Sequence, residues 1–153
     1  MNALHHGTHR LGLRIYFEDT DAGGIVYHAN YLRYAERGRS EALRALGAPH
    51  AEMIATHGRM FVVRRADIDY ERPARLDDAL IVVTRIITIT AATVTLDQTI
   101  WRDNLALVRI TLVLACVDAA SGRAARLPAP MRTALERMRM DGIADGRVAV
   151  EGT

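Results

Sequence analysis

The sequence predicts an α+β fold in which one long helix packs against a curved antiparallel β-sheet. One amphipathic helical segment lies near the N-terminus, between residues 30 and 46. Four or five strand-like segments then follow one another between residues 61 and 127. Consecutive strands joined by short turns pair antiparallel, and a single helix covers only one face of the resulting sheet.

The first strand is expected over residues 11–17. Its apolar positions alternate with polar residues or glycine, as in a half-buried strand: Leu11, Leu13, Ile15 and Phe17. A run of turn-forming residues from Asp19 to Gly24 ends the strand and predicts a loop.

The helix is expected from about Asn30 to Leu46, with Asn30 as its N-cap and Gly47 as its stop. Its polar residues fall on one face at helical spacing: Arg33, Glu36, Arg37, Ser40, Glu41 and Arg44. The opposite face carries small residues in its middle, Gly38 among them. Small residues allow a helix to lie close to a sheet, so this face is expected to meet the strands.

Further strands are expected over residues 61–70, 80–90, 93–102 and 106–116. A tight turn at residues 103–104 joins the last two. A short return strand over residues 123–127 and a helix over residues 128–140 complete the pattern. Such a sheet has exposed edges, which predicts a homodimer formed by edge pairing.

The length of 153 residues suffices for one domain with one core. We expect a flexible N-terminus over residues 1–9, a single domain over residues 10–140 and a loose tail over residues 141–153. No apolar run approaches the roughly 20 residues of a membrane span, and the N-terminus lacks the apolar region of a secretory signal. With Cys116 as its single cysteine, the chain is expected to be cytoplasmic.

The net charge and the type of basic residue limit the possible functions. The net charge of +2 is too small to indicate nucleic-acid binding. All 20 basic residues are arginine, so catalysis through a lysine Schiff base is excluded.

The densest polar cluster lies between the first strand and the helix, over residues 18–31. It contains three carboxylates, a histidine and two glycines next to a helix N-terminus. Unpaired N–H groups and the helix dipole at that end would polarise a carbonyl, and a nearby carboxylate could attack it or activate water. The same aspartates also fit simple Asx turns. The residue pattern alone leaves both interpretations open.

Residues 14–31 read Arg-Ile-Tyr-Phe-Glu-Asp-Thr-Asp-Ala-Gly-Gly-Ile-Val-Tyr-His-Ala-Asn-Tyr. This segment resembles the signature of the YbgC-type thioesterases, hotdog-fold relatives of 4-hydroxybenzoyl-CoA thioesterase. The resemblance resumes in shorter segments farther along the chain: residues 61–65, 70, 73–78, 117–118 and 127–128. It therefore covers about residues 10–139.

The resemblance implies the hotdog fold and hydrolysis of an acyl-CoA or acyl-carrier-protein thioester to a carboxylic acid and a thiol. Asp21 matches the catalytic carboxylate, acting as general base or as nucleophile. His28 matches the histidine that opens the helix, where the backbone N–H points at the thioester carbonyl. Tyr16 matches a site tyrosine on the preceding strand. The resemblance also implies a homodimer, often paired into tetramers, with no metal and no bound cofactor.

Other residues are expected to bind substrate or to shape the loop. We expect the loop segment after the aspartates to line the thioester: Gly24, Ile25, Val26 and Tyr27. Arg64 and Arg65 are candidates for the phosphates of coenzyme A, because guanidinium groups bind phosphate well. Glu18 and Asp19 are expected to shape the loop.

Two alternatives to a thioesterase remain open. A hotdog hydratase or dehydratase would add or remove water across a double bond with a similar carboxylate and histidine pair. A non-catalytic module would bind acyl carrier protein or enzymes of lipid synthesis without turnover.

Overall fold

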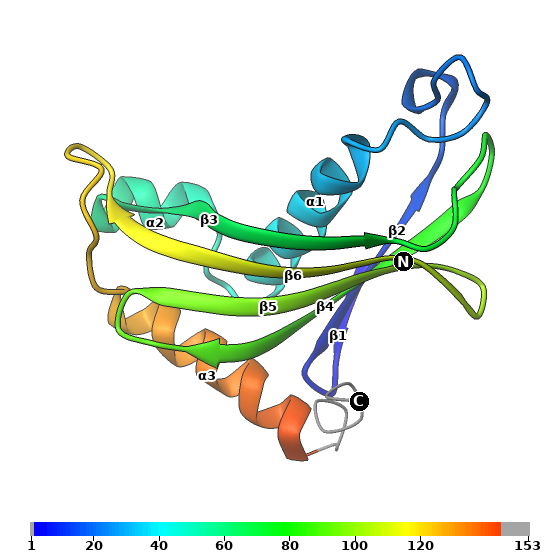
Figure 1. Cartoon of the computed structure of the whole chain (residues 1–153). Coiled ribbons are helices and arrows are strands. Elements are labelled where there is room, and N and C mark those ends of the chain that lie inside the picture. Colours follow the sequence, from blue (N-terminus) through cyan, green and yellow to red (C-terminus); the bar gives the residue numbers. More distant parts are fainter. Residues whose placement is uncertain (1, 145–153) are drawn as a thin grey trace.

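A computed structural model describes residues 2–144 and confirms the α+β fold, with a long helix lying in the curve of an antiparallel sheet (Figure 1). The strands are β1 (Asn2–His5), β2 (Thr8–Arg14), β3 (Arg59–Tyr70), β4 (Ala79–Ile89), β5 (Thr93–Arg102) and β6 (Leu105–Asp118). Their order across the sheet is β1-β2-β4-β5-β6-β3, and all neighbours pair antiparallel. Strands β4, β5 and β6 form the consecutive part of the predicted meander. Strand β3 departs from it, because it pairs with β6 at the far edge of the sheet and the chain crosses from β3 to β4, which lies beside β2.

The helices are α1 (Asn30–Ala45), α2 (His50–His57) and α3 (Ala129–Ala144), with a short 3-10 helix, η1 (Phe17–Asp19). Helix α2 was not predicted from the sequence. It starts after Pro49 and ends at Gly58, whose positive φ of 60° suits glycine. Within residues 2–144, every helix is too short or too polar to traverse a lipid bilayer.

Helix α1 lies close to the sheet because Gly38 faces it. A Cβ atom at Gly38 would lie 2.7 Å from Val82 Cγ1 on β4 and 3.2 Å from Gln98 Nε2 on β5. Gln98 is fully buried and donates hydrogen bonds to the Ala35 carbonyl of α1 (2.7 Å) and to Thr84 Oγ1 (2.9 Å). The predicted small-residue face is therefore the face that meets the strands.

The core fills the space between α1, α3 and the concave face of the sheet. The predicted apolar face of β6 is buried throughout: Ala106, Val108, Ile110, Leu112, Leu114 and Cys116. The predicted return strand is reduced to a single bridge between Val117 and Ala124. The first strand ends at Arg14 rather than at residue 17, and Phe17 is 81% exposed.

Residues 2–5, within the segment expected to be flexible over residues 1–9, form strand β1. Strand β1 pairs with β2 through a turn in which His6 and Gly7 both have positive φ. His9 is fully buried, and its Nε2 lies 2.7 Å from the Asn2 amide oxygen. The Asn2 amide nitrogen donates in turn to Glu41 of α1 (3.0 Å). These side-chain contacts between strand and helix fix the hairpin, and hydrophobic periodicity does not reveal them.

Helix α3 continues beyond residue 140 to Ala144, into the segment expected as a loose tail over residues 141–153. The rest of that prediction, residues 145–153, lies outside the described residues. Gly7 lies so close to this end of α3 that a Cβ atom added at Gly7 would be 2.4 Å from Gly142 Cα. The β1–β2 turn thus lies against the end of α3.

Candidate active site

The loop between β2 and α1 forms a small hairpin that docks on the β3–β4 connection. Thr20 bridges to Val26, and the Asp21 N–H donates to the Ile25 carbonyl (2.8 Å). The hairpin is anchored because the Val26 N–H donates to the Ala74 carbonyl (2.9 Å). This docking fixes the position of a polar loop that has little core of its own.

Asp21 lies at the turn of this hairpin with an exposed side chain. Its carbonyl accepts the Gly24 N–H (3.0 Å), and its Oδ1 accepts the Gly23 N–H (2.8 Å). Its Oδ2 has no hydrogen-bond or ion-pair partner among residues 2–144. Asp21 therefore makes the Asx turn and also presents a carboxylate oxygen available for chemistry.

The backbone N–H of His28 points outward from the start of α1. The Tyr27 carbonyl, which belongs to the same peptide unit, accepts the Asn30 N–H (2.9 Å) and so points toward the helix. In a trans peptide the N–H points opposite to the carbonyl, and all the described peptide bonds are trans. The His28 N–H makes no hydrogen bond to another described residue. The first turn of α1 itself carries no acidic residue.

The rest of His28 is held between the loop and the end of β3. The Tyr70 hydroxyl donates to the His28 carbonyl (3.3 Å). The His28 ring lies 4.7 Å from the Tyr27 ring and 6.1 Å from the Tyr70 ring, measured between centroids. Within residues 2–144, no hydrogen bond or ion pair joins Asp21 to His28.

Tyr16 and Asn30 each make a hydrogen bond that shapes the loop. Tyr16 is 62% exposed, and its N–H donates to Asp19 Oδ2 (2.7 Å), which starts η1. The N-cap of α1 is Ala29, and Asn30 is the first helical residue. The Asn30 side chain instead donates to the Asp19 carbonyl (2.9 Å). Asp19 thus shapes the loop, as expected.

The predicted substrate-binding residues fall into three groups. Gly24, Ile25 and Tyr27 stay on the surface of the loop or partly exposed. Val26 is different, because its side chain is only 3% exposed within the core, so it anchors the loop rather than offering a surface. Arg64 and Arg65 are exposed on β3, where Arg65 pairs with Asp67 (3.3 Å).

The arginines lie far from the loop within one chain. Strand residues rise by about 3.3 Å, so Arg64 and Arg65 are roughly 16–20 Å along β3 from Tyr70, the strand's contact with His28. Within one chain, the two arginines therefore cannot contact a substrate carbonyl that is bound at the His28 N–H. Contact with the distant phosphates of a long ligand such as coenzyme A remains a prediction.

Two further tyrosines support the site, and neither was predicted to have a role there. The Tyr31 hydroxyl accepts the Ala74 N–H (3.0 Å), which ties α1 to the β3–β4 connection. Tyr34 is 1% exposed; its burial, followed by the neighbouring Asp19 carboxylate, raises its pKa above the ordinary range. Their spacing of three residues on the buried helix face is the signal that could have identified them.

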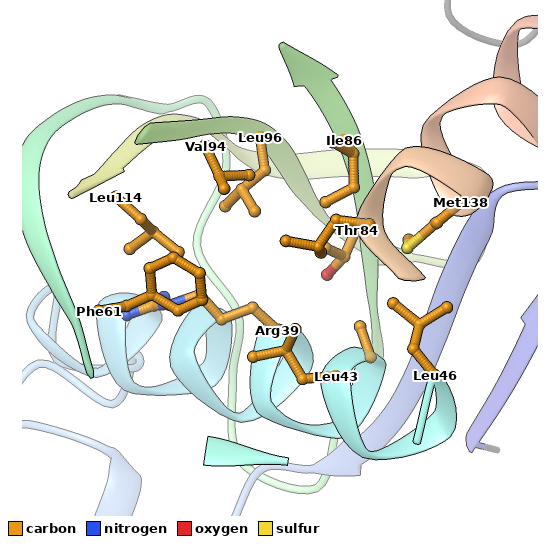
Figure 2. Close-up of a pocket in the computed structure, with 12 residues that line it drawn as sticks. Arg39, Leu43, Leu46, Phe61, Thr84, Ile86, Val94, Leu96, Leu114 and Met138 are labelled. Atoms are coloured by element: carbon orange, nitrogen blue, oxygen red, sulfur yellow. The ribbon is translucent and has the colours of Figure 1, made fainter. Parts of the chain in front are cut away.

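An apolar pocket lies at the other end of α1 (Figure 2). It is enclosed by α1, α3 and the concave face of the sheet, and Leu43, Leu114 and Met138 are among its lining side chains. The cavity measures about 20 Å³, which is room for about one water molecule. Burial lowers the pKa of Arg39, whose side chain lines the same pocket. The single chain therefore offers no ready space for an acyl group there.

Comparison with known proteins identifies the family. Residues 15–135 match the model of the thioesterase-like superfamily. The acyl-CoA thioesterase YbgC of Haemophilus influenzae is 38% identical over 127 residues, covering 83% of this chain and 93% of the relative. The acyl-CoA thioester hydrolase YbgC of Escherichia coli is 39% identical over 124 residues, covering 78% of this chain and 89% of the relative.

Solved structures agree with this result. A probable thioesterase from Bartonella henselae superposes with a TM-score of 0.76 at 36% identity, covering 79% of this chain and 99% of that chain. A 1,4-dihydroxy-2-naphthoyl-CoA thioesterase from Synechocystis superposes with a TM-score of 0.77 at 25% identity, covering 84% and 95%. With the fold, the loop motif and these matches in agreement, the chain belongs to the thioesterase-like superfamily, as a hotdog-fold relative of the YbgC acyl-CoA thioesterases.

Proposed function

We propose that the protein hydrolyses acyl-CoA or acyl-carrier-protein thioesters to a carboxylic acid and a thiol. The observation that carries this proposal is the outward-pointing, unpartnered N–H of His28 on the loop that also presents the free Asp21 oxygen. The names of the YbgC relatives support the same reaction class.

The chemistry follows from these two groups. The His28 N–H and the positive end of α1 polarise the thioester carbonyl and stabilise the oxyanion that forms on attack. Asp21 acts on the carbonyl carbon either directly, as a nucleophile, or through a water molecule that it deprotonates. The His28 ring orients the substrate or assists the departing thiol, and Tyr16 lies on the same exposed loop surface.

We also propose a homodimer that forms through β3, with tetramers as a further level of assembly. Strand β3 is a 12-residue edge strand, and its residues from Val62 to Asp67 are all exposed in the single chain. A long, unpaired edge strand with exposed valines favours pairing with another strand in solution. We propose that Arg64 and Arg65, exposed on this edge strand, bind the phosphates of coenzyme A in the assembled protein. A cytoplasmic location fits such substrates and the free, buried Cys116.

The test is a panel of acyl-CoA substrates of different chain length, with a thiol-reactive dye that reports released coenzyme A. We expect thiol release from saturated acyl-CoA. The 2-enoyl thioesters discriminate the hydratase alternative, which would add water and release no thiol. Binding of thioesters without turnover would instead indicate a non-catalytic module.

Asp21→Asn separates the two roles of this residue. The amide oxygen of asparagine still accepts the Gly23 N–H, so the turn is retained, while the negative charge is lost. We expect hydrolysis to fall by orders of magnitude, with little change in the affinity for a non-hydrolysable acyl-CoA analogue.

The matched control for Asp21→Asn is Glu18→Gln, which removes an exposed carboxylate from the same loop and should leave turnover unchanged. Asp19→Asn keeps an oxygen for the Tyr16 N–H and should lose less activity than Asp21→Asn. Near wild-type hydrolysis by a folded Asp21→Asn protein would show that the reaction is built on other residues.

A further inference from the structure

We infer that Asn30 is a positioning residue that sets the His28 amide against the Asp21 turn. The inference rests on the proposed function, because it assigns a role within that same site. Asn30 contacts neither reacting group through its side chain. Its two N–H donors instead hold the two backbone segments that carry those groups.

The first donor is the backbone N–H of Asn30, which binds the Tyr27 carbonyl (2.9 Å). This bond fixes the plane of the peptide between Tyr27 and His28. The direction of the His28 N–H depends on that plane, because the peptide is rigid and trans.

The second donor is the side-chain amide of Asn30, which binds the Asp19 carbonyl (2.9 Å). Asp19 lies two residues before Asp21, at the end of η1, where the chain enters the small hairpin. The same carbonyl also accepts the Tyr27 N–H (3.0 Å). The Asp19 carbonyl is thus held from both sides of His28, by Tyr27 before it and Asn30 after it.

The surroundings make this arrangement rigid. Asn30 is only 8% exposed, so water has little access to replace its amide. Its Oδ1 lies 3.5 Å from Arg33 Nη1, which is longer than an ordinary hydrogen bond, so Arg33 contributes little to the position of the amide. Tyr70 holds the His28 carbonyl from the end of β3 (3.3 Å). Among these links, the side chain of Asn30 alone joins the first turn of α1 to the segment before Asp21.

Asn30→Asp is the discriminating substitution. It preserves size but places a carboxylate oxygen where the amide donor was, against the Asp19 carbonyl. A carboxylate in the first turn is favourable for the helix itself, so folding should survive. We expect kcat to fall by about 10- to 100-fold with KM nearly unchanged, since misplacement of reacting groups by about 1 Å has effects of this order. Arg33→Ala, which leaves the Asn30 amide donor in place, should keep the wild-type kcat.

A second readout does not depend on turnover. In the Asp21→Asn background, the carbonyl stretch of a bound 13C-labelled acyl-CoA reports its polarisation by the His28 N–H. Infrared difference spectra should show a shift to lower frequency that shrinks when Asn30→Asp is added. Equal carbonyl frequencies, or a wild-type kcat in Asn30→Asp, would overturn the role of Asn30. Absence of thiol release by the wild-type protein would instead contradict the proposed function.

Discussion

The two oxygens of the Asp21 carboxylate have different surroundings, and the difference matters for its function. One accepts the Gly23 N–H, and the other has no described partner. Asp19, two residues away, is held by Tyr16 through its carboxylate and by Tyr27 and Asn30 through its carbonyl. Asp19 therefore stabilises the loop conformation, whereas Asp21 keeps one carboxylate oxygen available for reaction.

His28→Ala should lower turnover without abolishing it. The substitution removes the imidazole ring and its contacts with Tyr27 and Tyr70, but the backbone N–H and its direction remain. Steady-state kinetics on an acyl-CoA substrate should therefore show residual hydrolysis well above that of Asp21→Asn. A loss as deep as that of Asp21→Asn would mean that the ring, rather than the amide, carries the essential interaction.

Among the elements, α1 depends on its close approach to the sheet. The tightest point is Gly38, where an added Cβ would lie 2.7 Å from Val82 Cγ1 and 3.3 Å from Thr84 Oγ1. The buried polar contact from Gln98 to the Ala35 carbonyl lies at the same place. Any separation of helix and sheet here would also move the N-terminal turn that carries the site.

Gly38→Leu should therefore lower the free energy of unfolding by about 1–3 kcal/mol through overpacking. Helix propensity alone predicts the opposite sign, because glycine is a poor helix former. Thermal and urea denaturation would measure the change. Ala45→Leu, on the exposed side of the same helix, is the control and should stay within about 0.5 kcal/mol of wild type. A rise in Tm for Gly38→Leu would contradict the packing described.

The N-terminal hairpin should make stability depend on pH. Burial lowers the pKa of His9 below its ordinary value of 6.5. Its Nε2 faces the Asn2 amide oxygen, which only accepts, so the neutral ring already donates there. The folded state thus binds fewer protons than the unfolded state below about pH 6.5, and the stability contributed by neutral His9 is lost as pH falls through the folded pKa.

We expect His9→Gln to show a smaller drop in Tm than wild type between pH 7.5 and 5.5. The glutamine amide can still donate to Asn2, but it cannot take up a proton. His50, whose pKa burial also lowers, is present in both proteins, so the difference reports His9 alone. Parallel decreases in Tm for the two proteins would exclude His9 as the cause.

At the scale of the whole molecule, the two edges of the sheet are unequal. Strand β1 is a short edge of four residues, whereas β3 is a long edge of 12 residues with a bulge between Val63 and Arg65. Val63 is 50% exposed and Val62 is 38% exposed. The long edge is therefore the surface that most needs a partner.

Light scattering at micromolar concentration should give a mass of at least twice the 16.9 kDa of one chain. Replacing both Val62 and Val63 with lysine should shift the protein toward the monomer, because edge lysines oppose strand pairing. The matched control replaces Leu4 of β1, which is also partly exposed, with lysine and should leave the mass unchanged. A fully active wild-type monomer would contradict the proposed assembly.

The sequence by itself determined the fold class, the helix over residues 30–45, the strands that follow it and the loop that holds Asp21 and His28. These depend on local periodicity and on short motifs, which the chain carries within a few residues. The sequence did not determine that β3 pairs with β6 rather than with β4. The first strand's end at Arg14, helix α2 and the N-terminal hairpin were not predicted correctly, because side-chain contacts such as His9 with Asn2 have no periodic signal.

Only the tertiary structure decided how the site is held. The direction of the His28 N–H depends on the Tyr27 carbonyl, and the position of the loop depends on Ala74, Tyr31 and Tyr70, which lie elsewhere in the chain. Tertiary packing likewise made Val26 a core residue and Asn30 a tie to Asp19 rather than an N-cap. The physical reason is that hydrogen-bond partners distant in sequence are chosen by packing, while the pattern of residue types fixes only which segments fold as helix, strand or turn.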